Sequence, residues 1–208
     1  MVIIAAWQYT PNWLPEAFLF DAGFIIEGVV YTFWVYVPLV LASLVWNLGA
    51  SPGVWLVCLL FGLALWTPIE YLVHRYALHR LAPHYQHHDE PTVVAYIFAP
   101  LWLSGFSAVL LWGLLALTVG SWRRGALVEA GTMLGYLIYE AVHVRIHSAA
   151  AGGPILRALR KHHYYHHFAD DTRCFGVTSG IWDRIFGTGS DPRLSAADEN
   201  ADTVTRAR

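Results

Sequence analysis

The chain is 208 residues long, which is the length of a single domain. Of its residues 56% are hydrophobic and 15% aromatic, only 13% are charged, and the mean hydropathy is +0.43. This composition excludes an ordinary soluble domain and is typical of a membrane protein. A formal net charge of -2 gives no indication of a nucleic-acid partner. The two cysteines, Cys58 and Cys174, are too few for a disulfide framework and favour a reducing compartment.

The first half of the chain contains two apolar stretches that predict membrane spans. Residues 1–20 mix tryptophan, tyrosine and proline with short apolar patches, which is typical of either an interfacial lead-in or a frayed terminus. Val29–Leu48 is a run of 20 uncharged residues, enough to cross a hydrocarbon core of about 30 Å. After a turn rich in glycine and proline, a second span starts at Val54 and continues past Ile69, where the helix carries His74 to the aqueous side.

Two further spans are predicted in the second half. Val93–Gly120 holds 28 residues without a charge and predicts either a tilted span or a bent hairpin. Ala126–Val144 is less apolar, because Glu129 and Glu140 lie within it, and a pair of histidines follows at its end. A basic, histidine-bearing helix is predicted over Ile155–Asp171.

The remaining sequence and the distribution of charge complete the predicted architecture. Residues 1–188 are expected to form one membrane domain, and the polar tail 189–208 to be disordered. Of 13 lysines and arginines, only Arg123 and Arg124 lie in the loop between the third and fourth spans, so the positive-inside bias puts both termini and all histidines on the cytoplasmic side. We expect an all-α integral membrane protein with about four transmembrane helices and a cytosolic, helical, histidine-rich cap. The membrane is either a bacterial cytoplasmic membrane or the endoplasmic reticulum.

The 11 histidines fall into four sequence groups, and none lies elsewhere in the chain. The groups are His74 and His79; His84, His87 and His88; His143 and His147; and His162, His163, His166 and His167. Histidine is a poor filler of apolar surface but the commonest side-chain ligand of transition metals. Because one metal takes about four to six ligands, this number of imidazoles implies either two metals or one metal with many unused imidazoles, and we favour two metals at one membrane face.

Helical spacing predicts which of these side chains point the same way, because each residue advances about 100° around a helix. Both histidines of the third group share a face, and so do His163, His166 and His167. His162 pairs with His166 at the same spacing, so geometry alone leaves it open as a ligand.

The first two groups have a less regular spacing. His87 and His88 are adjacent and diverge by about 100°, as ligands of two neighbouring metals would. His74 and His79 are five positions apart, so they serve one site either from opposite sides of a helix or from a helix that ends between them.

The residues around the histidines indicate which kind of metal site they form. A structural zinc site is saturated by about four ligands and usually recruits cysteine, which is absent from the histidine groups. The soluble di-iron pattern needs two Glu-x-x-His motifs, and only Glu140–His143 matches. We therefore favour histidine-ligated redox iron, which activates dioxygen toward an unreactive C–H bond.

Two carboxylates are candidates for the support of the ligands. Glu70 lies four residues before His74 and Glu140 three before His143, on the same helical faces. A carboxylate that accepts the distal N–H of a ligating histidine fixes its tautomer, and Tyr139 is a further candidate. The alternative is an interfacial glutamate that pairs with a neighbouring arginine.

The motifs also carry a resemblance to a known family. They are HRYALH at His74–His79, HxxHH at His84–His88, HVRIH at His143–His147 and HYYHH at His163–His167. Together they resemble the fatty acid hydroxylase and sterol desaturase superfamily. The segment FGVTSGIWDRIFGT, Phe175–Thr188, is similar to the one that follows the last histidine motif of fatty acid 2-hydroxylases. Earlier in the chain, Tyr139–Glu140 resembles a Tyr–Asp pair of the same enzymes. The resemblance covers Glu70–Thr188.

The resemblance implies a four-span membrane protein whose cytosolic dimetal site holds two iron ions and uses O2 and two electrons. It assigns as metal ligands His74, His79, His84, His87, His88, His143, His147, His163, His166 and His167. His162 stands where the pattern has a non-ligand. The short gap between His79 and His84 and the glutamate at position 140 depart from the pattern and bear on the shape of the substrate entrance.

Electrons are expected to come from a separate donor protein or reductase. The basic face of Arg157, Arg160 and Lys161 suits an acidic carrier, although it suits anionic lipid equally well.

The leading hypothesis is a membrane di-iron monooxygenase that hydroxylates a fatty acyl chain at carbon 2. The alternatives are a hydroxylase or desaturase of another apolar lipid, such as a sterol or carotenoid, and a metal-binding membrane protein without turnover. Zinc is expected to replace iron readily on isolation, because imidazole sites accept it and it binds more tightly than Fe2+.

Overall fold

The computed structural model describes residues 22–99, 101–147 and 153–191, and the described chain is all-α, as predicted. Its elements are α3 (Ala22–Trp46), α4 (Pro52–Tyr76), η1 (Leu78–Arg80), α5 (Ala82–Asp89), α6 (Val94–Ile97), α7 (Leu101–Thr118), α8 (Trp122–His147), α9 (Pro154–Phe168) and α10 (Ile181–Phe186). The expectations for residues 1–20 and for most of the tail lie outside the described residues.

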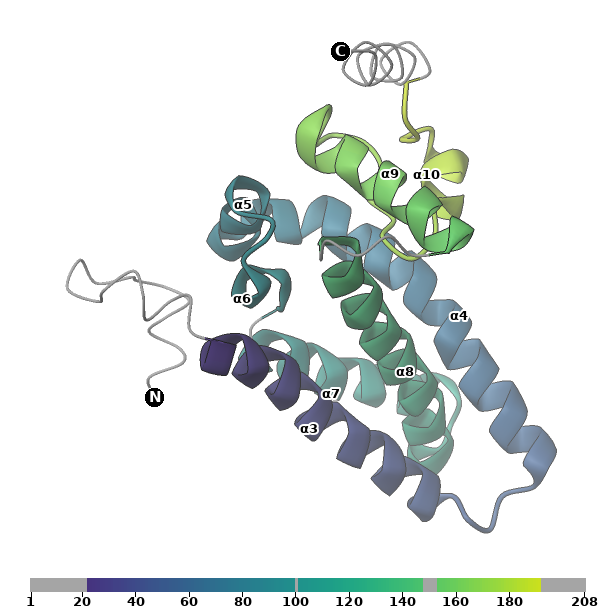
Figure 1. The fold of residues 1–208 in the computed structure, drawn as a ribbon. Coiled ribbons are helices and arrows are strands. Elements are labelled where there is room, and N and C mark those ends of the chain that lie inside the picture. The colour runs from purple at the N-terminus through teal and green to yellow at the C-terminus, as the bar shows by residue number, and fades with distance from the viewer. Residues whose placement is uncertain (1–21, 100, 148–152, 192–208) are drawn as a thin grey trace, which may run out of the picture.

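Helix α8 is central, and α3, α4 and α7 pack around it (Figure 1). The backbones of α4 and α8 touch because glycines lie at their contact. A Cβ atom on Gly62 would lie 2.0 Å from the carbonyl oxygen of Val128, and one on Gly131 would lie 2.3 Å from that of Leu59. Small residues at such crossings are the usual means by which helices in a membrane approach closely.

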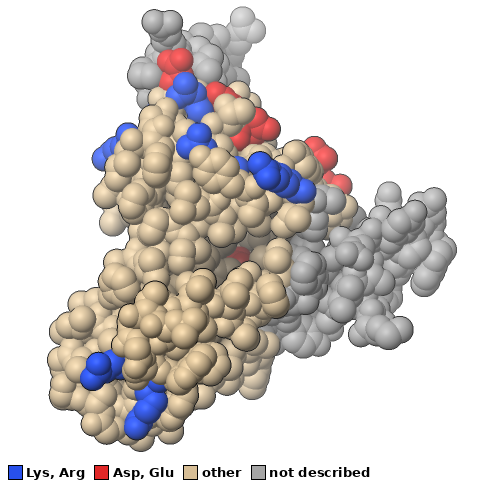
Figure 2. All heavy atoms as spheres, turned by 180° about the vertical axis from the view of Figure 1, so that it is seen from behind, with Lys and Arg blue, Asp and Glu red and all other residues tan. Residues whose placement is uncertain are grey.

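The outward faces of α3, α4 and α7 are apolar. Trp34, Phe61 and Leu117 expose 72%, 54% and 73% of their surface. The stretch Pro52–Arg80 is long and apolar enough to cross a membrane, and Thr32–Trp46 and Leu103–Thr118 are shorter apolar helices. In Figure 2 an uncharged belt separates lysine and arginine side chains at the two ends of the molecule. Exposed apolar faces of this kind are typical of membrane proteins, and the described residues include one candidate membrane span.

Two predicted spans differ in detail from the expectation. The uncharged run 93–120 is interrupted, since α6 ends at Ile97 and α7 begins at Leu101; Pro100 disfavours helical backbone in the residue before it. The fourth stretch forms the greater part of α8, whose acids Glu129 and Glu140 are buried inside the protein. Its lower hydropathy follows from that burial, because the other helices cover much of it.

The histidines and the arginine pair lie at opposite ends of the helices. At one end the turns α3–α4 and α7–α8 meet, where the Asn47 side chain donates to the carbonyl of Arg123 at 2.9 Å. At the other end α5, η1, α9 and α10 form a cap over the ends of α4 and α8 (Figure 1). All described histidines belong to this cap or to the helix ends beneath it.

Candidate metal centre

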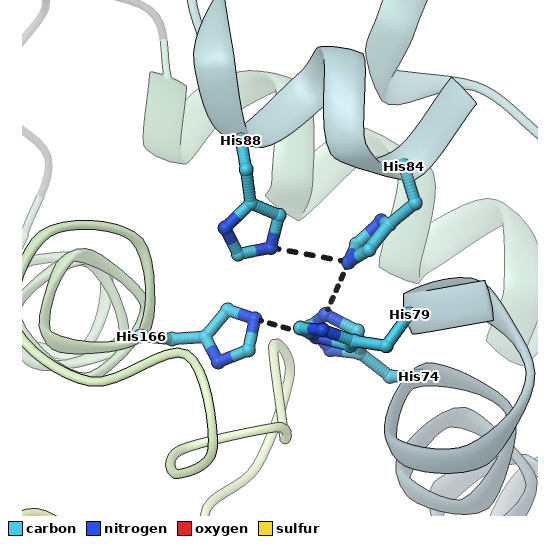
Figure 3. Close-up of side chains that lie close together, drawn as sticks. All are labelled: His74, His79, His84, His88 and His166. Carbon is cyan, nitrogen blue, oxygen red and sulfur yellow. Dashed lines mark hydrogen bonds between the residues drawn. The ribbon is translucent and has the colours of Figure 1, made fainter. Parts of the chain in front are cut away.

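One set of five imidazoles, here called site A, gathers where α4, η1, α5 and α9 meet (Figure 3). Its members are His74, His79, His84, His88 and His166. The Nε2 atom of His84 lies 3.1 Å from that of His74 and 3.2 Å from that of His88. The Nε2 atoms of His79 and His166 are 3.2 Å apart. One ligand atom from each of the five lies within 4.8 Å of all the others.

A second set, site B, gathers between α5, α8 and α9. Its members are His87, His143, His147, His163 and His167. The Nε2 atom of His163 lies 3.0 Å from that of His143, 2.9 Å from that of His147 and 3.0 Å from that of His167. The structure thus divides ten of the 11 histidines into two groups of five.

These contacts are not a network of hydrogen bonds. A neutral ring nitrogen carries either one proton or one lone pair, so His163 can donate to only one of its three Nε2 neighbours. The remaining lone pairs face one another and repel unless a cation lies between them. Five converging imidazole nitrogens form the kind of donor set that divalent transition metals accept. Both sites therefore fit a metal ion.

Burial keeps these ligands neutral, as metal binding requires. Burial first, and the neighbouring imidazoles second, lower the pKa of His88 to about 4 and that of His167 to about 2. Burial and His88 together bring the pKa of His166 to about 3. The lone pairs of these rings are therefore available near pH 7.

The spacing predictions agree with the structure in two respects. α4 ends at Tyr76 and η1 follows, so a helix end separates His74 from His79 while both serve site A. The adjacent His87 and His88 point into different sites, as their divergence indicated.

One spacing prediction was wrong. His163, His166 and His167 do not all point the same way, because His166 belongs to site A and the other two to site B. The reason is the same offset of about 100° between adjacent residues that separates His87 from His88. α9 therefore lies between the two sites and supplies ligand candidates to both.

The loop after α9 fixes the tautomers of two imidazoles of site A. His74 Nδ1 donates to the carbonyl of Phe175 at 2.5 Å, and His166 Nδ1 donates to the carbonyl of Arg173 at 2.6 Å. A proton on Nδ1 leaves the lone pair on Nε2, which faces site A. Between the two carbonyls lies Cys174, whose φ of 58° is in the left-handed region and whose N–H donates to the Thr188 carbonyl at 2.7 Å.

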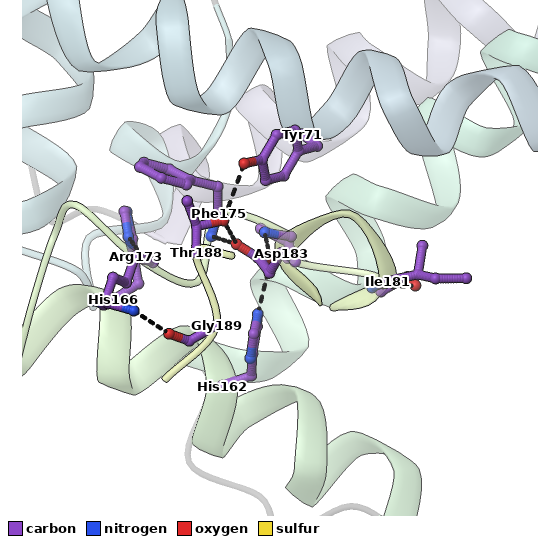
Figure 4. Close-up of polar contacts among 12 residues, drawn as sticks. Tyr71, His162, His166, Arg173, Phe175, Ile181, Asp183, Thr188 and Gly189 are labelled. Atoms are coloured by element: carbon purple, nitrogen blue, oxygen red, sulfur yellow. Dashed lines mark hydrogen bonds and ion pairs between the residues drawn. The ribbon is translucent and has the colours of Figure 1, made fainter. Parts of the chain in front are cut away.

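Asp183 on α10 holds this loop in place (Figure 4). Its Oδ1 accepts from the Phe175 N–H at 2.9 Å and from the Thr188 hydroxyl at 2.7 Å. Its Oδ2 accepts from the Gly176 N–H at 2.8 Å and lies 3.0 Å from His162 Nε2. Burial would raise the pKa of Asp183, but these hydrogen bonds outweigh it and lower the pKa. His162 thus lies outside both sites and contacts Asp183 instead.

Glu70 holds the other side of the same loop. It accepts from the N–H groups of Val177 and Thr178 at 2.6 and 2.8 Å, and also from the Thr178 hydroxyl. The predicted direct bond from His74 to Glu70 is therefore not formed, because a peptide carbonyl takes the Nδ1 proton. Glu70 supports His74 through the loop. No role for Asp183 was predicted from the sequence, although this residue lies within the segment Phe175–Thr188 that carries the family resemblance.

The predicted pair Tyr139–Glu140 lies beside site B. The Tyr139 and His143 rings are 5.4 Å apart between centroids, and Glu140 has no exposed surface. In the described part of the chain no hydrogen bond joins Glu140 to His143. Instead Glu140 and Tyr139 line a cavity of about 80 Å³ whose wall also includes Glu70 and His84 of site A.

The sequence matches the model of the fatty acid hydroxylase family over residues 59–188, which include all ten histidines of the two sites. The chain belongs to the fatty acid hydroxylase family. It is therefore a family enzyme with a histidine-rich metal site. The family match ends at Thr188, the residue that binds both Asp183 and Tyr71 through its hydroxyl.

Similar proteins with assigned activities were also found. The chain is 27% identical to a dihydroceramide fatty acyl 2-hydroxylase of Arabidopsis thaliana, over 88% of this chain and 84% of the relative. It is 28% identical to human fatty acid 2-hydroxylase over 79% of this chain, and it spans 54% of that relative's length. The solved hydroxylase domain of Scs7p superposes with a TM-score of 0.69 at 26% identity, covering 77% of this chain and 66% of the solved one.

Proposed function

We propose that this protein is a membrane di-iron monooxygenase that hydroxylates a fatty acyl chain at carbon 2, using O2 and two electrons. The observation that carries the proposal is the contact between site A, through His84, and a mainly apolar cavity. A chain bound in that cavity therefore lies against site A, and Tyr139 of the same wall lies next to His143 of site B. The names of the Arabidopsis and human relatives support acyl 2-hydroxylation.

The ten histidines of sites A and B are proposed to hold the two metals, five to each site. Iron is proposed because, when bound by imidazoles, it supplies the redox chemistry that reduces O2 and oxidises a C–H bond. The protein's own contribution is to hold the lone pairs in place. Glu70 does so through the loop after α9, while Tyr139 and Glu140 are proposed to shape the wall between site B and the substrate.

The position of the metal sites favours attack close to the polar end of the lipid. Sites A and B lie where the ends of α4 and α8 meet the cap (Figure 1). A lipid whose chain enters the cavity from that end presents its first carbons to the metals. Holding one carbon beside the oxidant turns an unselective reaction into a selective one.

The helices α3, α4, α7 and α8 are proposed as four membrane spans, with the cap on the cytoplasmic side. The apolar stretches on α3, α4 and α7 and the uncharged belt support this arrangement. The excess of basic residues in the cap favours the cytoplasmic orientation.

An acidic electron-donor protein is proposed to dock on α9, next to both sites. Arg157 and Lys161 are exposed on this helix, whose other face provides His163 and His166. Opposite charges on the two partners would speed their encounter.

The proposal is tested by expression in a host that lacks hydroxylated lipids, followed by fatty acid profiling. The wild type is expected to yield 2-hydroxy acyl chains and His166→Ala none, while Tyr85→Phe, a change of an exposed α5 residue, keeps the activity. A hydroxylated sterol or carotenoid that depends on His166, without any 2-hydroxy acid, would overturn the acyl assignment. A protein that binds metal but yields no hydroxylated product would favour the alternative of a metal-binding membrane protein without turnover.

A further inference from the structure

The cavity beside the metal sites continues deep into the helical bundle. A second cavity of about 140 Å³ lies between α3, α4, α7 and α8. Both cavities are lined by Trp66, Val73, Leu78, Ala99 and Tyr136, so they meet along a shared wall. Figure 2 shows a hollow in the uncharged belt with an acidic side chain at its floor. Together the two cavities lead from His84 toward the middle of the bundle.

The far end of this path is polar, which an ordinary acyl chain does not require. Glu129 lines the second cavity, is only 4% exposed, and its Oε2 has no hydrogen-bonding partner among the described residues. Thr132 lies beside it, but its hydroxyl already donates to the carbonyls of Gly62 and Val128, each at 3.3 Å. The carboxyl of Glu129 is therefore an open hydrogen-bonding group of this cavity, and the hydroxyls of Tyr36 and Tyr136, which line it too, also have no partner among the described residues.

Such a group needs a partner. Burying a polar group without a hydrogen bond is costly, and an ionisable side chain within a membrane span usually has a function. No ion pair with a described lysine or arginine satisfies Glu129. A hydrocarbon chain that reached the carboxyl would displace water and offer no hydrogen bond in return.

We propose that Glu129 forms a polar subsite that recognises a hydroxyl group at the far end of the acyl chain and excludes plain chains long enough to reach it. The inference rests on the proposed function, since it takes the occupant of the path to be an acyl chain. Glu129 and Glu140 are on one helix and eleven positions apart, which places them about 16 Å apart along its axis. That span sets the chain length at which the terminal group first meets Glu129.

The test measures binding and not turnover, so that it stays informative if the reaction differs from the one proposed. Metal-loaded protein in detergent, without reductant, is titrated with fatty acids of increasing length, with and without a terminal hydroxyl, against a fluorescent acyl probe. Beyond a threshold length, the wild type is expected to bind the hydroxylated acid about tenfold more tightly than the plain one. Glu129→Leu is expected to abolish or reverse that preference and to admit longer plain chains.

Two controls keep the result interpretable. Glu129→Gln retains a hydrogen-bonding group and is expected to retain most of the preference, while Leu134→Ala changes an exposed residue of the same helix and leaves it intact. Equal length profiles for wild type and Glu129→Leu, with normal metal content in both, would overturn the subsite. If no fatty acid displaces the probe from any variant, the acyl-binding assumption itself fails.

Discussion

Asp183→Asn is expected to weaken metal binding at site A while site B stays loaded. The carboxylate accepts from two backbone N–H groups, Phe175 on Oδ1 and Gly176 on Oδ2, and also contacts Thr188 and His162. Asparagine keeps one accepting oxygen, so its NH2 group must face one of the two N–H groups. The loop whose carbonyls bind the Nδ1 atoms of the site A imidazoles then loses its anchor.

The magnitude follows from the contacts that are lost. Hydrogen bonds to a charged acceptor are worth about 1.5–3 kcal/mol each, and a buried N–H group left without a partner adds a penalty of similar size. We expect the free energy of unfolding to fall by about 3 kcal/mol. Loss of the groups that orient ligating histidines typically lowers metal affinity about 10–100-fold, and here the loss should be confined to site A.

The assay is elemental analysis together with chelator competition on purified protein, run beside thermal unfolding. The wild type is expected to hold two metals and Asp183→Asn close to one after mild chelation. Glu90→Gln, which removes an exposed carboxylate of the cap, should behave as the wild type. If both metals were lost with the same affinity change, or if neither were lost, the selective support of site A by this loop would be refuted.

Three further predictions follow from the described contacts. Gly131→Val forces a side chain into the backbone of α4 and should lower the free energy of unfolding by about 3 kcal/mol or more in denaturation experiments. Gly113 faces open space, so Gly113→Ala should change the free energy of unfolding little. In the metal-free protein, burial holds the pKa of His88 and other cap imidazoles below the ordinary value. The stability of the folded protein should therefore fall as the pH drops below about 6.5, because only the unfolded chain then takes up protons. Melting temperatures that do not fall between pH 8 and pH 5 would contradict this. Burial raises the pKa of Cys174 to about 12, so in a Cys58→Ser background the native protein should resist alkylation at pH 8 and react only when unfolded, as mass spectrometry would show.

Much of the site was predictable because its information is local. Helical spacing determines which histidines share a face, and adjacent residues necessarily diverge, so the assignment of His87 and His88 to different sites could be foreseen. The same offset separates His166 from His167, but spacing alone does not decide which of the two shares a site with His163, so the split of His166 from His163 could not be foreseen. It depends on α9 lying between the two sites, which is a matter of tertiary packing.

The hydrogen bonds of Glu70 to the loop after α9 could not be predicted from the sequence for a similar reason. Glu70 bonds to residues more than a hundred positions away, and a carboxylate beside His74 in sequence indicates a direct contact unless the long-range partner is known. The central position of α8 was also obscured, because its charges suggested a poor span and not a helix shielded by three others. Hydropathy reports the average surroundings of a segment and says nothing of which neighbours provide them.

The most direct test of the account is oxygen labelling with the iron-loaded protein. Purified protein in detergent would receive an acyl lipid, a chemical or enzymatic electron donor and 18O2, and the product would be analysed by mass spectrometry. We predict a 2-hydroxy acyl chain that carries one 18O atom, and no such product from His84→Ala. Hydroxylation at another carbon would contradict the proposed position, and a product free of 18O, or none from fully loaded protein, would contradict the monooxygenase itself.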